Sequence, residues 1–126
     1  MQARVTLHGN VAVLRFDGGE VLDSYVANDV KAQAFRRLQG RTDLVIDLGN
    51  LEFIDSAGLG VLVGIYKRVK QRGQRVVVAK APPYIARVMK IMRLDRVFES
   101  FDDVASALAE FSRDAPIGAG GTRTRR

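Results

Sequence analysis

Two short apolar runs, each next to a segment of helical periodicity, most strongly constrain what this chain can fold into. Residues 44–48 (Leu-Val-Ile-Asp-Leu) and 75–79 (Arg-Val-Val-Val-Ala) are nearly continuous apolar runs, which is typical of strands covered on both faces. Between them, residues 57–72 have the pattern of a helix that ends at Gly73. Buried strands joined by helices favour an α/β domain with a mixed, mainly parallel β-sheet.

The same alternation continues toward both ends of the chain. A Gly-Asn turn between two strand-like runs predicts a β-hairpin near the N-terminus. Three further helices are expected to begin at Asp23 or Ser24, at Pro82-Pro83 and at Asp102-Asp103, because apolar residues at helical spacing follow each start. The predicted order is β-β-α-β-α-β-α-β-α, with about four α-helices: strands at 4–7, 11–16, 44–48, 75–79 and 97–98, and helices over about 23–38, 57–72, 82–92 and 102–111.

The length and composition indicate one domain followed by a tail. The chain has 126 residues, of which 47% are hydrophobic, enough for a single core. We expect the domain to cover residues 1–112. Residues 113–126 are mainly Gly, Ala, Thr and Arg, which cannot bury enough apolar surface to order themselves, so we expect a disordered basic tail there.

Several function classes are excluded by what the sequence lacks. It has no cysteine and a single histidine, His8, so we expect no disulfide, no metal centre and no cofactor. No secretion signal or membrane-spanning run is visible, which favours a cytoplasmic protein. The net charge is +6, but aromatic residues are not interleaved with the basic ones, so direct nucleic-acid binding is not expected.

The segment 51–62 carries the most chemical information. The strand-like run Leu-Glu-Phe-Ile ends at Asp55 and Ser56, and a glycine-rich apolar helix is expected to follow at once. A serine at a helix N-terminus lies where backbone N–H groups are unpaired and the helix dipole is positive, so a phosphate there would be tolerated by the fold. The neighbouring Asp55 would repel that phosphate and keep its charge exposed. The alternative is that Ser56 is only a helix cap.

The glycines of this helix leave other hypotheses open. Gly58 could let a partner's backbone approach, whereas Gly60 and Gly64 are expected to let the helix pack close to the sheet. The spacing nearly matches a dinucleotide-binding fingerprint. However, the third glycine comes one residue late, and Lys80 stands about twenty residues on, where the fingerprint has an acidic residue. A serine hydrolase is disfavoured because there is no G-x-S-x-G element. Nothing supports an acid–base pair of Asp47 and Asp55.

Three segments together resemble a known family, the STAS domain, and within it the bacterial anti-sigma factor antagonists. They are residues 47–62 (DLGNLEFIDSAGLGVL), 66–73 (YKRVKQRG) and 88–98 (VMKIMRLDRVF), and the resemblance covers residues 4–111. It implies the STAS fold and a partner-switching function. The unphosphorylated protein would bind an anti-sigma factor that is also a serine kinase. Phosphorylation would end that complex, and a PP2C-type serine phosphatase would restore it.

The resemblance also implies roles for particular residues. Ser56 would be the phosphorylation site, and Ala57 leaves it as the only acceptor at that spot. Asp23, which follows Gly19-Glu20, would lie near the phosphosite and contact the kinase together with Asp55. Gly58 and Leu59 would lie on the docking surface.

The protein itself would be a substrate and binder rather than an enzyme, and we expect a monomer or weak dimer. Its basic residues after the phosphosite are expected to be a solvated face or to recognise an acidic partner: Lys67, Arg68, Lys70 and Arg72. The alternatives are a non-switching STAS scaffold, a transporter-associated module, or a nucleotide- or small-molecule-binding domain.

Overall fold

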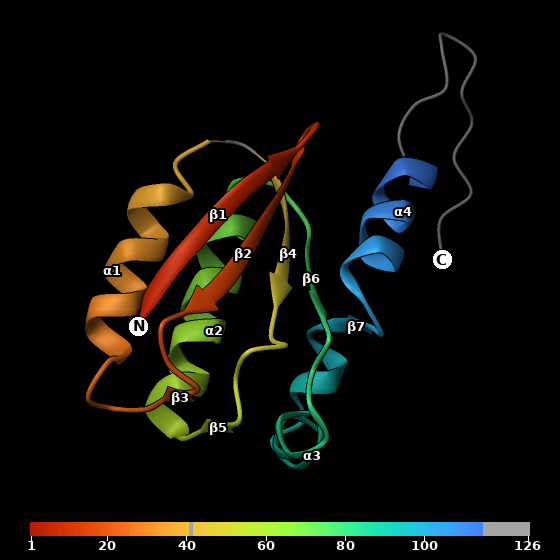
Figure 1. Cartoon of the computed structure of the whole chain (residues 1–126). Helices are drawn as coiled ribbons and strands as arrows, with labels where there is room; N and C mark the ends of the chain where they lie inside the picture. The colour runs from red at the N-terminus through yellow and green to blue at the C-terminus, as the bar shows by residue number, and fades with distance from the viewer. Residues whose placement is uncertain (41, 115–126) are drawn as a thin grey trace, which may run out of the picture.

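The computed structural model describes residues 1–40 and 42–114, with side chains to residue 112. Figure 1 shows a central sheet with helices on both sides. The elements are β1 (Gln2–His8), β2 (Val11–Asp17), β3 (Val21–Leu22), α1 (Ala27–Arg37), β4 (Asp43–Asp47), β5 (Phe53–Ile54), α2 (Ser56–Gln71), β6 (Val76–Ala79), α3 (Pro83–Ile91), the 3₁₀ turn η1 (Leu94–Arg96), β7 (Glu99–Phe101) and α4 (Val104–Asp114).

The main sheet has the strand order β1-β2-β4-β6-β7. β1 and β2 form the predicted antiparallel hairpin, and every other pairing in this sheet is parallel. A second, two-stranded sheet joins β3 and β5 in parallel. The predicted α/β class and mainly parallel sheet are therefore confirmed. The predicted element order did not include β3 and β5, although β5 lies in the apolar run that ends at Asp55.

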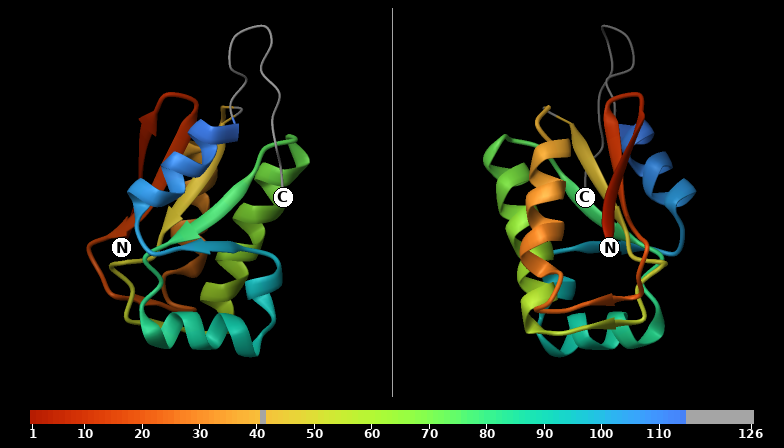
Figure 2. Two further views of the ribbon diagram at one scale, coloured as in Figure 1. Left: turned by 90° about the vertical axis from the view of Figure 1, so that its right-hand side faces the viewer. Right: turned by 60° about the vertical axis from the view of Figure 1, so that its left-hand side comes forward.

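The sheet separates two hydrophobic cores, because side chains along β2, β4 and β6 alternate between its faces. The larger core lies under α1, α2 and α3, and a smaller core lies under α4 (Figure 2). In β4, for example, Leu44 and Ile46 enter the larger core and Val45 enters the smaller one. Strands buried on both faces explain the nearly continuous apolar runs in the sequence.

The first helix begins later than predicted. Asp23 accepts a hydrogen bond from the Tyr25 amide, and its backbone oxygen accepts from Val26 and Ala27. These bonds form a turn, and α1 begins at Ala27 with no side-chain cap. The prediction that Asp23 or Ser24 caps this helix is therefore wrong, because a local turn uses the Asp23 carboxylate instead.

The predicted strand at 97–98 is also wrong. The backbone amides of Val97 and Phe98 donate to the carbonyl of Leu94, so they belong to a turn, and β7 begins only at Glu99. Phe98 is apolar because its ring packs edge-on against Tyr66 in the larger core, with ring centroids 5.2 Å apart. Burial, rather than strand pairing, accounts for the apolar pattern there.

The last helix passes the residue at which the sequence predicts the end of the domain, residue 112, and that boundary stays a prediction. α4 continues to Asp114, and the prediction of a disordered tail falls otherwise on residues 115–126, outside those that the structure describes. Over the described ranges, none of the helices combines the length and apolar character needed to span a bilayer.

Candidate functional site

The candidate site is built where β5 runs into α2. The cap of this helix is Asp55, not Ser56: its backbone is extended and its Oδ1 accepts a hydrogen bond from the Gly58 amide at 2.9 Å. Ser56 is the first helical residue, and its side chain is exposed to solvent. The alternative in which Ser56 serves only as a cap is therefore wrong, because the preceding carboxylate fills that role.

The second oxygen of Asp55 ties this corner to a distant part of the chain. Asp55 Oδ2 accepts a hydrogen bond from the Ser24 amide at 3.1 Å. Parallel pairing of β3 and β5 sets Leu22 opposite Ile54, so Asp23 and Asp55 leave the small sheet at the same end. The structure thus brings Asp23 beside Asp55, next to Ser56. Two carboxylates at one corner give it a negative character.

Gly58 and Leu59 are not surface residues, contrary to the sequence-based expectation. A Cβ added at Gly58 would lie 2.2 Å from the backbone oxygen of Leu22. Glycine is needed here because β3 passes directly over the first turn of α2. Leu59 is only 8% exposed and belongs to the larger core. Both residues hold the corner in shape, and neither offers exposed surface to a partner.

The other two glycines of α2 also differ from expectation. A Cβ at Gly60 would meet nothing within 4 Å, and Gly60 is exposed one turn after Ser56. At Gly64 the nearest atoms belong to the Lys31 side chain of α1, at 3.1 Å. Neither glycine brings α2 closer to the sheet. It is Gly60, rather than Gly58, that leaves the surface beside Ser56 open.

Exposed aromatic side chains near this corner were missed from the sequence. Tyr25, two residues after Asp23, is 94% exposed. Phe53 of β5 and Tyr84 of α3 stack with ring centroids 5.7 Å apart, and each is about two-fifths exposed. Contiguous exposed apolar patches on a small domain, rather than single exposed side chains, mark interaction surfaces, and the stacked pair is the start of such a patch. Tyr25 lies in a polar stretch between a strand and a helix, and this position was the signal in the sequence that could have predicted its exposure.

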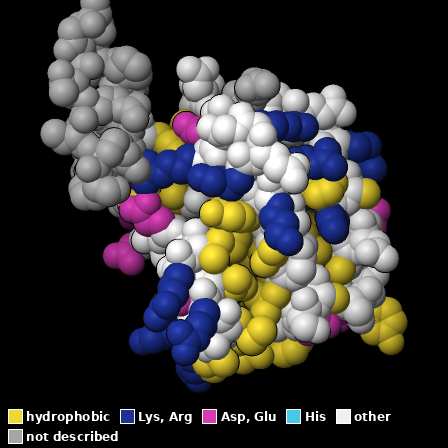
Figure 3. All heavy atoms as spheres, turned by 180° about the vertical axis from the view of Figure 1, so that it is seen from behind, with side chains coloured by type: hydrophobic (Ala, Val, Ile, Leu, Met, Phe, Trp, Pro, Cys, Tyr) yellow, Lys and Arg dark blue, Asp and Glu magenta, His cyan; other side chains and the backbone are white. Residues whose placement is uncertain are grey.

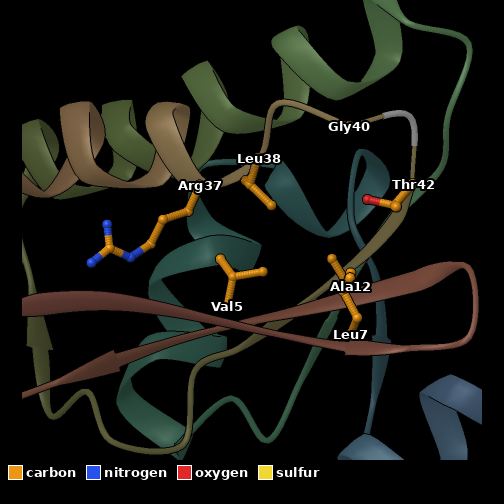
Figure 4. Close-up of a pocket in the computed structure, with 7 residues that line it drawn as sticks. All are labelled: Val5, Leu7, Ala12, Arg37, Leu38, Gly40 and Thr42. Atoms are coloured by element: carbon orange, nitrogen blue, oxygen red, sulfur yellow. The ribbon is translucent and has the colours of Figure 1, made fainter.

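A pocket elsewhere on the molecule does not involve this corner. A cavity of about 350 Å³ lies between the β1–β2 hairpin and the C-terminal end of α1 (Figure 4). Its lining is mainly apolar: Val5, Leu7, Ala12, Arg37, Leu38, Gly40 and Thr42. At the glycine-rich corner, by contrast, β3 covers Gly58, which leaves no room there for a pyrophosphate to approach the backbone. Among the side chains that the structure describes, those of residues 1–40 and 42–112, no group of three or more His, Cys, Asp or Glu residues could hold a metal ion.

Of the four basic residues expected to form a solvated face, Arg72 is the one that is partly buried. Its Nη1 donates to the backbone oxygens of Leu38 and Gly40, the latter at 3.1 Å. These acceptors lie just after the end of α1. Arg72 therefore fastens the end of α2 to the end of α1, whereas Lys67, Arg68 and Lys70 are exposed.

Comparison with known proteins gives consistent matches over most of the chain. The STAS domain family matches residues 2–107. An anti-sigma F factor antagonist of Paenibacillus polymyxa is 31% identical over 87% of this chain and 94% of its own. An anti-sigma-B factor antagonist of Listeria monocytogenes is 35% identical over 67% of this chain and 74% of its own.

A solved structure matches the fold as well. An anti-sigma-factor antagonist (STAS) domain protein from Planctomyces limnophilus superposes with a TM-score of 0.82 and 24% identity, over 89% of this chain and 99% of that one. At that identity the likeness establishes the fold alone.

Proposed function

Since this chain belongs to the STAS domain family, we propose that it is an anti-sigma factor antagonist controlled by phosphorylation of Ser56. Unphosphorylated, it binds an anti-sigma factor that is a serine kinase. The kinase transfers the γ-phosphoryl group of ATP to the Ser56 hydroxyl oxygen, releasing ADP and the hydroxyl proton, and the complex then separates. A PP2C-type phosphatase hydrolyses the phosphate ester. The observation that carries the proposal is the exposed Ser56 hydroxyl at the start of α2, beside Asp23 and Asp55.

The local geometry favours a phosphate that the fold tolerates but does not neutralise. The start of α2 supplies a positive dipole end, which accommodates an anion. However, Asp55 already occupies the Gly58 amide, and its own charge repels a phosphate. A phosphate on Ser56 would therefore present a charge of about −1.5 to −2 at the surface.

That charge would act against a partner docked over the corner. Exposed apolar area is present on the segments that flank this corner: Tyr25 follows Asp23 by two residues, and Phe53, which stacks on Tyr84, precedes Ser56 by three. Burying an unpaired phosphate against apolar groups costs several kcal/mol, of the order of 2–7 even for a neutral polar group. Each 1.4 kcal/mol or so corresponds to a tenfold loss of affinity. Phosphorylation can therefore release the partner without a change of fold.

Incubation with candidate kinases tests this function. The protein is mixed with ATP and the anti-sigma factor kinases encoded in the same genome, and the modified residue is located by mass spectrometry. We expect phosphate on Ser56 and none on the Ser56→Ala variant, which should still bind the kinase. If every candidate kinase leaves Ser56 unmodified, the switch is disproved.

A negative charge at position 56, without phosphorylation, should also release the kinase. Ser56→Asp and Ser56→Glu are expected to weaken kinase binding at least about tenfold while the thermal unfolding midpoint stays close to that of the unmodified protein. Ser56→Asn is the uncharged control of similar size and should retain most of the affinity. Equal affinity for Ser56→Asp and Ser56→Asn would contradict the electrostatic argument.

A further inference from the structure

A group of basic side chains covers the side of α1 and α2 away from the sheet, and we call it the basic face: Lys31, Arg36, Lys67, Arg68 and Lys70. Figure 3, which views the molecule from behind, shows lysine and arginine side chains gathered on this side. α2 contains no acidic residue, and the one acid of α1, Asp29, accepts a hydrogen bond from Gln33. The ion pairs among the described residues involve Arg4, Arg15 and Arg75. None of these three arginines belongs to the basic face.

Part of the basic face is held in place by the seam between the two helices. The Arg68 guanidinium lies 3.9 Å from the centroid of the Phe35 ring, and the Lys31 ammonium lies 5.7 Å from it. The Lys31 side chain also runs beside Gly64. These contacts fix two of the charges without neutralising them, which lowers the entropy lost when a partner binds.

The basic face is positioned on the same side of α2 as the candidate phosphosite. Ser56, Gly60 and Lys67 stand at positions i, i+4 and i+11 of the helix, and all three are exposed. At 1.5 Å per residue, Lys67 lies about 16 Å from Ser56 along the axis. A standard protein interface covers about 800 Å² per partner, a disc with a radius of about 16 Å. The rim of a partner centred on Ser56 would therefore lie at Lys67, and Lys70, about 21 Å from Ser56 along the axis, would lie just beyond it.

We infer that the basic face recognises an acidic surface on the kinase that docks at Ser56, and that it speeds their encounter. This inference rests on the proposed function. Charges at the rim of an interface act mainly on the association rate and on its salt dependence, whereas groups at the centre act on the dissociation rate. Because the Debye length is about 8 Å at physiological salt, a phosphate on Ser56 would be screened from Lys67. The basic face would keep attracting the kinase after phosphorylation, and only the lifetime of the complex would fall.

Association kinetics with matched variants test the inference. The double variant Lys67→Gln and Lys70→Gln removes two positive charges from the basic face. The control is the double variant Arg4→Gln and Arg15→Gln, which removes two positive charges from paired positions of β1 and β2. Their neighbours along these strands point into the larger core, so the two arginines lie on the other face of the sheet. Both keep the chain full-length, and equal unfolding midpoints would verify folding. Rates are measured with the purified kinase at low and high salt.

The Lys67/Lys70 variant is expected to associate about threefold to tenfold more slowly than the control at low salt, with unchanged dissociation, and the difference should vanish at high salt. Equal association rates for the two variants would overturn the inference while leaving Ser56 phosphorylation intact. Unchanged kinase association together with lost binding to a DNA duplex would also overturn it and assign the face to nucleic acid. Absence of any kinase binding by the unmodified protein would instead refute the proposed function.

Discussion

Gly58 and Gly60 lie two residues apart in α2 and meet opposite surroundings. The backbone of β3 crosses directly over Gly58, whereas Gly60 faces open space. A single added methyl group therefore has opposite effects at the two positions. Position 58 must be glycine because a side chain would not fit under β3. Position 60 has room for a side chain, so glycine there only lowers the stability of the helix. The lack of a side chain at Gly60 leaves an open surface next to Ser56.

Alanine substitutions should separate these two roles. Gly58→Ala is expected to lower the free energy of unfolding by at least about 2 kcal/mol, because its Cβ would overlap the Leu22 carbonyl. Gly60→Ala should raise it by about 0.5–1 kcal/mol, since alanine favours a helix and meets no neighbour. Urea denaturation of both variants measures the difference. Equal effects would show that β3 does not press on the first turn of α2.

Tyr25 is expected to anchor the docked partner. It is 94% exposed and makes little contact with its own fold, so Tyr25→Ala should leave the unfolding midpoint unchanged. Tyrosine is enriched among the few interface residues whose truncation costs about 2 kcal/mol or more, so with Tyr25 as such an anchor the kinase affinity should fall about thirtyfold. Leu7→Ala, at another exposed apolar residue on the β1–β2 hairpin, is the control. A loss of affinity as large for Leu7→Ala would place the interface elsewhere.

At the scale of the elements, α4 shows how a capping carboxylate can make a helix sensitive to pH. Asp103 Oδ1 accepts a hydrogen bond from the Ser106 amide at 2.7 Å, at the start of α4. This bond, together with the Ser106 hydroxyl and the charge of Lys80, lowers the pKa of Asp103 below its ordinary value of 3.8. The ionised form is therefore the one that stabilises the folded state.

The pH dependence follows from the direction of this shift. The stabilisation is fully present above the ordinary pKa and is lost as the pH falls through the lower pKa of the folded state. Asp103→Asn keeps a good helix cap but cannot titrate, so it should remove this contribution to the acid sensitivity of α4. Amide hydrogen exchange of α4 at decreasing pH is the measurement, with Asp102→Asn as control. Retained acid sensitivity in Asp103→Asn would assign the effect to other carboxylates.

At the scale of the whole molecule, α4 is attached to its face of the sheet by a small core and one buried carboxylate. Glu110 is only 5% exposed and lies 3.4 Å from the Arg75 guanidinium of the loop before β6. The same guanidinium lies over the Phe111 ring, with 5.2 Å to its centroid. Arg75 therefore joins the sheet to α4 in two ways, through an ion pair with Glu110 and by packing on Phe111.

Glu110→Ala should destabilise the domain more than removal of the exposed partner of the same arginine. We expect Glu110→Ala to lower the free energy of unfolding by about 1–3 kcal/mol. The substitution leaves a cavity, and it removes the buried carboxylate that pairs with the Arg75 guanidinium. Glu99→Ala removes a carboxylate whose side chain is 51% exposed and should cost less than about 1 kcal/mol. Urea denaturation compares the two variants. Equal losses would mean that burial at Glu110 contributes nothing beyond a surface ion pair.

The sequence by itself determined the alternation of strands and helices and the place of the candidate site. Apolar runs at 44–48 and 75–79 are typical of strands covered on both faces, and the helical patterns around them indicated an α/β domain. Helical periodicity located α2 to within one residue of its start and its end. Such patterns are local, because each depends on residues a few positions apart along one element. The Asp55-Ser56 corner was therefore predictable as a strand end leading into a helix.

Only the tertiary structure decided which residues at that corner are exposed. The pairing of β3 with β5 buries Gly58 under Leu22 and brings Asp23 to Asp55, and both contacts join residues more than thirty positions apart. No local pattern contains such information, because burial depends on what the rest of the chain packs against each element. For the same reason the structure, and not the sequence, assigned the cap to Asp55 and the open surface to Gly60, and showed that the Tyr25 side chain is exposed.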